Sequence, residues 1–148
     1  MAKLKIQQIK SDYFTLEEFI NSATAQRLKI DNTPTADIIR NLQYGVDMVL
    51  EPLRRLQSKP IKITSGYRCP RLNKAVGGVN NSWHLRGCAA DVHVENEDDA
   101  KEKFAILKKL PSVDTALFEH STTGQWLHVQ WDMARTPRKH FNYNFQAS

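Results

Sequence analysis

The sequence lacks several features that would narrow its class at once. It has only two cysteines, Cys69 and Cys88, and no CxxC pair, so cysteine ligation of a metal is not expected. The thiols either pair in an oxidising compartment or stay free, with Cys88 as a small apolar core residue. No apolar run reaches membrane-spanning length, and the amino-terminal stretch has no signal-like apolar segment. The sequence thus predicts synthesis in the cytoplasm, without a signal peptide or a transmembrane segment.

A concentrated basic surface is also missing. The formal net charge is +5, which favours an anionic partner. The Lys and Arg residues are nevertheless scattered and form no long stripe interleaved with aromatics, so no nucleic-acid partner is expected, and a basic nucleic-acid-binding domain is only a minor alternative. With 148 residues, of which 41% are hydrophobic, the chain is long enough for one domain, residues 1–148, with a buried core.

Local patterns that are present predict an α+β fold. Thr15 and Glu18 form a capping-box pattern at the start of a first short helix, and a polar connection follows it. Apolar spacing predicts two further helices, at about 34–56 and 97–110. Strand-like runs lie at 61–64, 89–94, 115–118 and 125–131, the last two forming a hairpin around 121–124, and 138–148 is expected to be a loose tail. Helices before and between mostly antiparallel strands give an α+β arrangement.

Two residues suit a metal site. His84 follows turn-forming residues, and Asp91 opens an apolar alternation seven residues later, with Gly87 between them. His128, in the strand-like run 126–131, is a candidate third ligand. Two imidazoles and one carboxylate leave the fourth position of Zn²⁺ open, as in catalytic zinc sites. A His-x6-Asp pair alone also arises by chance, so this spacing is weak evidence.

The sequence around His84 and Asp91 contains more specific motifs. The motifs, in chain order, are SGYR at 65–68, LN at 72–73, VGG at 76–78, SxHxxGxAxD at 82–91 and WxHV at 126–129. Over about residues 34–131 the chain resembles the zinc D-Ala-D-Ala carboxypeptidase family, which includes phage and bacterial peptidoglycan peptidases. The resemblance implies a Hedgehog/DD-peptidase-like zinc fold, a small antiparallel sheet with helices packed on one side. It also implies a Zn²⁺ ion held by His84, Asp91 and His128.

The resemblance further suggests residues that act on substrate. Arg68, from the SGYR motif, would contact a substrate carboxylate or stabilise developing negative charge, although it could also brace its loop. Ser82 would hydrogen-bond substrate or cap the turn before His84. Trp126 alternates with His128 on one strand face, which would place it in the cleft wall, although aromatic residues beside ligands often only pack.

The general base is where the chain departs from the pattern. Many relatives carry a carboxylate three residues before the last histidine ligand, where this chain has Gln125, and an amide cannot accept a proton. Glu119, at the end of the preceding strand-like run, is the leading substitute, and His120 is second. Strand neighbours point to opposite faces, so at most one of the two faces the metal. Glu119 could also be an exposed strand-end carboxylate.

These observations predict a zinc metallopeptidase that hydrolyses peptide bonds of bacterial cell-wall peptidoglycan, as a D-Ala-D-Ala carboxypeptidase or an endopeptidase. Its partners would be peptidoglycan stem peptides, and a monomer is expected. Without an export signal, it would reach the wall through a membrane lesion, as phage lysins do, or as part of a particle. The alternative that Gln125 keeps open is a non-catalytic, zinc-containing cell-wall-binding or phage-particle module.

Overall fold

A five-stranded sheet organises the chain. The computed structural model describes residues 7–122 and 124–143, and within them the strands have the order β1-β2-β4-β3-β5. Neighbouring strands are antiparallel except that β5 runs parallel to β3. The α+β class is confirmed, and the sheet is mixed rather than purely antiparallel. The strands are β1 (Ile63–Ser65), β2 (Ala89–His93), β3 (Thr115–Ser121), β4 (Gly124–Gln130) and β5 (His140–Asn142).

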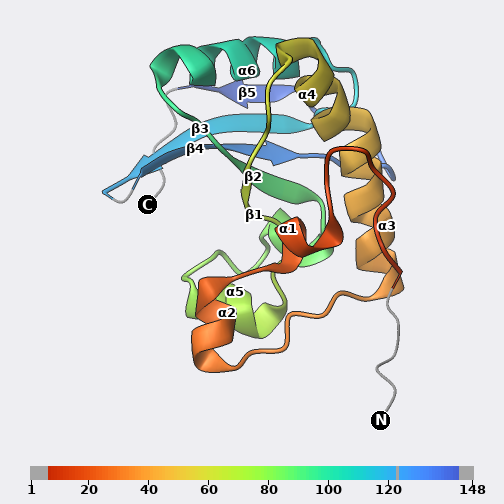
Figure 1. Ribbon diagram of the computed structural model, residues 1–148, viewed down its shortest axis with the longest axis vertical. Coiled ribbons are helices and arrows are strands. Elements are labelled where there is room, and N and C mark those ends of the chain that lie inside the picture. Colours follow the sequence, from red (N-terminus) through yellow and green to blue (C-terminus); the bar gives the residue numbers. More distant parts are fainter. Residues whose placement is uncertain (1–6, 123, 144–148) are drawn as a thin grey trace.

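A long interrupted helix runs along one side of the sheet (Figure 1). It consists of α3 (Ala36–Gly45), a π-helical turn η1 (Val46–Leu50) and α4 (Glu51–Gln57), which matches the helix expected at 34–56. The irregular turn comes directly before Pro52, at the start of α4. Proline has no N–H to donate and its ring crowds the carbonyl four residues earlier, and the widened π-helical turn relieves this crowding.

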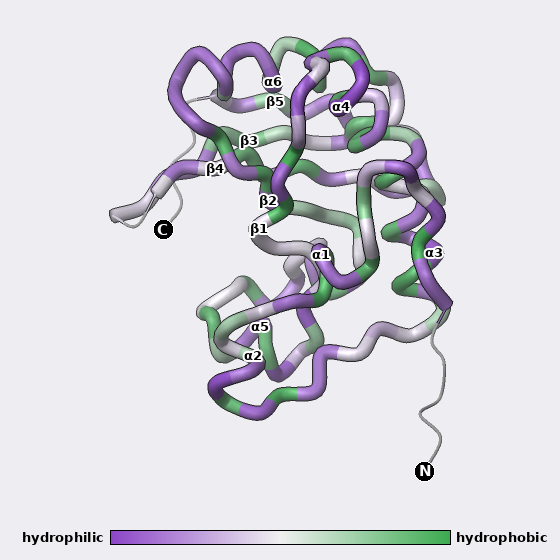
Figure 2. Tube along the Cα trace, viewed as in Figure 1, coloured by the Kyte–Doolittle hydropathy of each residue, from purple (hydrophilic) through white to green (hydrophobic). Residues whose placement is uncertain are grey.

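The core lies between this helix and the sheet. Trp131 is fully buried, and its indole nitrogen donates to the Asn41 carbonyl on α3 at 2.9 Å. A Cβ on Gly45 would come within 2.0 Å of the Trp131 ring, so only glycine permits this close approach. The helix α6 (Glu97–Lys109) also packs on this side, against α4, β3 and β4. In Figure 2 the strands and α3 carry green, hydrophobic positions, whereas α6 is mostly purple.

Short helices form a smaller lobe beyond β1 (Figure 1). They are α1 (Leu16–Ile20), α2 (Ala23–Leu28), α5 (Pro70–Ala75) and the 3-10 turn η2 (Trp83–Arg86). The capping box is present, with the Thr15 amide donating to Glu18 at 2.7 Å. The polar connection expected after α1 is wrong, because α2 occupies it. Ser22 caps α2 by accepting from the Ala25 amide at 3.1 Å, and a helix of one or two turns carries too short a period to be recognised.

The expectation of a loose tail is also wrong for its described part. His140–Asn142 forms β5 beside β3, and the Arg138 guanidinium donates to the fully buried Asp114 carboxylate at 2.9 and 3.0 Å. A buried carboxylate needs such a partner, and this pair fixes the chain entering β5. Residues 144–148 lie outside the described part. Among the described residues, no helix is long and apolar enough to span a bilayer.

Candidate metal centre

The three predicted metal ligands come from two adjacent strands and one short turn. Asp91 on β2 and His128 on β4 are directly paired across the sheet, so their side chains share a face and lie close together. His84 lies on η2. Ser82 caps this turn, because its Oγ accepts a hydrogen bond from the backbone N–H of His84 at 3.2 Å. The Arg68 amide donates to the His84 carbonyl at 3.1 Å. These backbone contacts fix η2 over the strands.

Gly87 makes this placement possible. Its φ of 71° lies in the left-handed region, which ends η2 and turns the chain into β2. A Cβ there would also come 2.9 Å from the Ile38 side chain on α3. The glycine therefore lets the turn that carries His84 approach the long helix and deliver Asp91 onto its strand.

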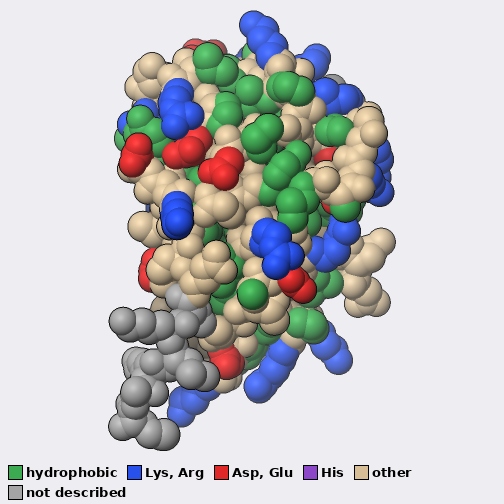
Figure 3. All heavy atoms as spheres, turned by 90° about the vertical axis from the view of Figure 1, so that its right-hand side faces the viewer, with side chains coloured by type: hydrophobic (Ala, Val, Ile, Leu, Met, Phe, Trp, Pro, Cys, Tyr) green, Lys and Arg blue, Asp and Glu red, His purple; other side chains and the backbone are tan. Residues whose placement is uncertain are grey.

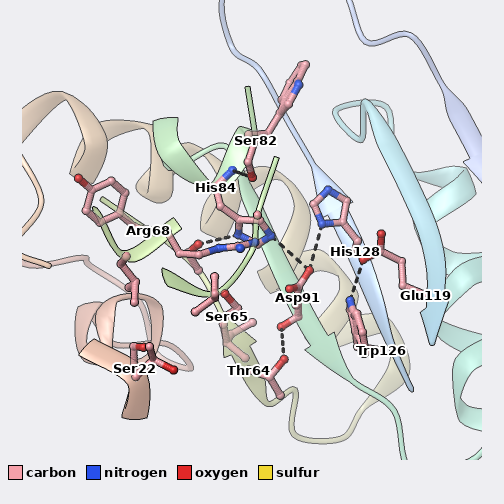
Figure 4. A pocket seen from close by; sticks show the side chains of 18 of the residues that line it. Ser22, Thr64, Ser65, Arg68, Ser82, His84, Asp91, Glu119, Trp126 and His128 are labelled. Carbon is pink, nitrogen blue, oxygen red and sulfur yellow. Dashed lines mark hydrogen bonds and ion pairs between the residues drawn. The ribbon is translucent and has the colours of Figure 1, made fainter. Parts of the chain in front are cut away.

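The ligand atoms converge at one point (Figure 4). Asp91 Oδ1 lies 3.4 Å from His84 Nε2 and 3.0 Å from His128 Nδ1, and one ligand atom from each residue lies within 4.8 Å of the others. His84 Nε2 is buried and makes no hydrogen bond. Buried polar atoms are rarely left without a partner. A metal ion bound to His84 Nε2 would supply the missing partner.

Hydrogen bonds on the far side of each ring set the tautomers. His84 Nδ1 lies 2.6 Å from the Gly66 carbonyl, which can only accept, so Nδ1 carries the proton and Nε2 presents a lone pair. His128 Nε2 lies 2.7 Å from Gln130 Oε1, which accepts the proton that this ring would keep on Nε2 when Nδ1 binds a metal. Two imidazole nitrogens and a carboxylate oxygen therefore converge, which is the donor set that Zn²⁺ takes in catalytic sites.

The electrostatics of the cluster favour an ionised Asp91 carboxylate. Burial alone would raise the pKa of Asp91, but the facing His84 and His128 hold it well below its usual range. Burial lowers the pKa of His128, and the hydrogen bond and charge of Asp91 outweigh that effect and raise it. The carboxylate is thus kept ionised, which is the form that binds a metal.

The cluster lies in a cleft of about 1270 Å³. The predicted site residues all line it: Arg68, Ser82, His84, Asp91, Glu119, Trp126 and His128. Arg68 is half-buried, and its Nε makes no hydrogen bond. Burial lowers the pKa of this guanidinium, although Asp91 and Glu119 oppose the effect. Arg68 is therefore a cation held close to the metal residues with hydrogen-bonding capacity to spare.

Glu119 and Trp126 form a pair on the cleft face of the hairpin. They lie opposite each other on β3 and β4, and the Trp126 indole nitrogen donates to Glu119 Oε1 at 2.7 Å (Figure 4). Glu119 is therefore a positioned carboxylate and not a free strand end. His120 lies on the other face of β3, with its ring centroid 6.0 Å from that of Phe118. Gln125 is exposed and, three residues from His128 in a regular strand, also points away from the cleft.

Sequence reasoning did not assign the hydrogen bonds that orient the ligands. The alternation that places Trp126 and His128 on the cleft face also places Gln130 there, but it gives no indication that Gln130 contacts the His128 ring. The Gly66 carbonyl belongs to the SGYR motif, but a backbone oxygen leaves no residue-type signal in a sequence.

The comparisons with known proteins agree with this geometry. No curated protein matches the chain. A family model described as Peptidase M15 matches residues 12–130, the region that holds α1 to β4 and every residue of the cluster. The chain belongs to the peptidase M15 family, the zinc D-Ala-D-Ala carboxypeptidase family.

Proposed function

We propose that the chain is a zinc-dependent peptidase that hydrolyses peptide bonds of bacterial cell-wall peptidoglycan. The observation that carries the proposal is the convergence of His84 Nε2, Asp91 Oδ1 and His128 Nδ1 in a cleft of about 1270 Å³. Each ring has its other nitrogen engaged, so the three donor atoms are oriented before an ion binds. Such preorganisation is typical of a functional metal site.

Each cleft residue has a separate role in this proposal. Zn²⁺, held by the three ligands, would supply Lewis-acid chemistry. Glu119 accepts the indole hydrogen bond on Oε1 and keeps Oε2 for the proton of the attacking water, as a general base. Arg68 stabilises the negative charge that develops on the scissile carbonyl oxygen. Ser82 accepts from the His84 amide, and its own hydroxyl hydrogen is left to donate to the substrate.

The shape of the cleft favours an endopeptidase over a carboxypeptidase within this proposal. Its lining extends from Ser22, which caps α2, and Gln26 on α2 to Trp126 on β4. In Figure 4 the metal residues lie between Ser22 on one side and the pair of Glu119 and Trp126 on the other. A substrate chain could therefore continue on both sides of the reacting bond, whereas a carboxypeptidase needs to close around a chain end.

The experiment is incubation of the purified, zinc-assayed protein with defined muropeptides and whole sacculi, with products read by mass spectrometry. We expect cleavage that a chelator abolishes and added zinc restores, and the fragment masses would name the bond. Alanine variants of His84, Asp91 and His128 should each lose stoichiometric zinc and activity. Retained zinc and turnover in one variant would remove that residue from the ligand set.

The same experiment separates the alternatives. Bound zinc without cleavage of any muropeptide would support a non-catalytic wall-binding or particle module. Salt-dependent retention on DNA without zinc would support a nucleic-acid-binding domain. Action on the wall after release or delivery from the cytoplasm is part of the proposal, and cleavage of sacculi added from outside would be consistent with it.

A further inference from the structure

A second depression adjoins the cleft and is built from one tryptophan and three arginines. It has a volume of about 480 Å³, and Asn81, Ser82 and Trp83 line both it and the cleft. Trp83 precedes the metal ligand His84 on η2, so its ring forms part of the boundary between the two spaces. A group bound in the depression would therefore lie next to a substrate bound at the metal.

The three guanidinium groups surround the Trp83 ring. Their central carbons lie 4.4 Å (Arg86), 4.7 Å (Arg135) and 5.0 Å (Arg138) from the ring centroid. These contacts are within the range of cation–π attraction. Arginine that packs against a ring loses little freedom on binding, because its planar fork is already held in place.

The arginines differ in what their N–H groups already bind. Arg138 is committed to the buried Asp114, to which it donates from Nε and Nη2. Arg86 and Arg135 make only longer ion pairs, at 3.7 and 3.5 Å from the Asp132 carboxylate, and Arg135 also lies 4.0 Å from Asp114. Within the described residues, their guanidinium groups have no hydrogen-bond partner, and their side chains are 50% and 45% exposed. Two oriented forks are therefore available to a ligand.

The charge balance limits what that ligand can be. Asp114 and Asp132 offset two of the three positive charges, so the depression suits a single anionic group and not a polyanion. On the face that carries α3, the Lys and Arg side chains stand at separate places among other residues (Figure 3), which gives no track for an extended polymer of phosphates. A carboxylate matches both the charge and the planar fork of arginine.

We propose that Arg86 and Arg135, packed on Trp83, bind a carboxylate of the peptide substrate away from the bond that is cut. This inference rests on the proposed peptidase function, because it takes the ligand to be part of the same peptide. It makes the depression a specificity subsite, which selects stem peptides whose acidic groups are free over those in which they are carboxamides.

The test compares two stem peptides that differ only in their non-terminal carboxylates, free in one and carboxamide in the other. With the zinc-loaded protein we expect KM for the free acid to be about tenfold lower, with kcat similar for both. The variants Arg86→Gln and Arg135→Gln should raise KM for the acid peptide toward that of the amide peptide. KM for the amide peptide should not change. Arg40→Gln is the matched control, since Arg40 is also an exposed arginine in an ion pair, with Asp37 on α3.

A binding measurement keeps this inference separate from the peptidase proposal. The same two peptides are titrated into the protein, and the indole N–H signal of Trp83 is followed by NMR. Failure of both peptides to be cleaved, with a saturable shift from the acid alone, would overturn the peptidase proposal and keep the carboxylate site. Equal KM values and equal shifts for acid and amide in the wild-type protein would overturn the site, whatever the stability of the variants.

Discussion

Replacing Glu119 by Gln tests the proposed general base with little disturbance of the fold. In the structure, Glu119 uses Oε1 to accept the Trp126 indole hydrogen at 2.7 Å. A glutamine keeps an acceptor oxygen for that bond and has nearly the same volume. The side chain is only half-buried, so we expect the free energy of unfolding to change by less than about 1 kcal/mol. The metal ligands are untouched, and zinc content should stay stoichiometric.

Activity should fall sharply because an amide cannot accept the proton of the attacking water. Loss of a positioned general base typically costs about 100- to 10,000-fold in rate, or about 3–5 kcal/mol in activation free energy. The assay is single-turnover cleavage of a defined muropeptide by a saturating excess of enzyme, which isolates the chemical step from binding and product release. Metal analysis and urea unfolding of the same preparation complete the measurement.

Two further variants serve as comparisons for the rate of Glu119→Gln. Glu17→Gln removes an exposed carboxylate from α1 and should leave the rate unchanged. Trp126→Phe keeps the Glu119 carboxylate but removes its hydrogen-bond donor, so we expect a smaller loss, about tenfold. An undiminished rate for Glu119→Gln would refute the assignment, and loss of zinc from that variant would show that the residue supports the metal site instead.

Two other perturbations follow from the contacts. Gln130→Met removes the acceptor that holds the His128 ring, so zinc affinity in a chelator competition should fall about 10- to 100-fold, with His128 itself intact; unchanged affinity would argue against this orienting role. In the wild type the buried ammonium of Lys103 lies 2.6 Å from the Asp99 carboxylate, and Asp99→Asn removes that charged partner. The free energy of unfolding at pH 7, measured by urea unfolding, should fall by about 3 kcal/mol. Burial would raise the pKa of Asp99, but hydrogen bonds from Lys103 and Lys59 hold it below its usual range. Its stabilisation is thus present above about pH 4 and is lost as pH falls through the lowered pKa, so the variant's stability should vary less than that of the wild type over this interval.

The parts of the fold that the sequence predicted are those with a repeated period. The alternation of 126–131 gave both the strand and the faces of its residues, and the structure places Trp126 and His128 in the cleft and Leu127 in the core. The long helix gave a clear apolar stripe. The short helices α2 and α5 gave none, because each is held by its caps and by contact with the other elements of its lobe.

The candidate site divides in the same way. Side chains in a motif can be recognised by residue type, and the three metal residues do converge. Hydrogen bonds to a backbone oxygen, such as that from His84 to Gly66, depend on tertiary placement and leave no such trace. The cluster around Trp83 also joins η2 to residues about fifty positions later along the chain, and no local spacing could predict that contact.

The strand geometry finally accounts for Gln125, whose amide kept the non-catalytic interpretation open. The pairing of β3 with β4 is regular from Thr115 to Ser121, so side chains alternate without a bulge and position 125 faces away from His128. An acid at that position would not reach the cleft. We therefore expect Gln125→Glu to leave the rate of the wild type unchanged and to give no recovery in the Glu119→Gln background, in the same single-turnover assay. Recovery of activity in the double variant would mean that the hairpin shifts its register in solution, and the assignment of the base to β3 would then fail.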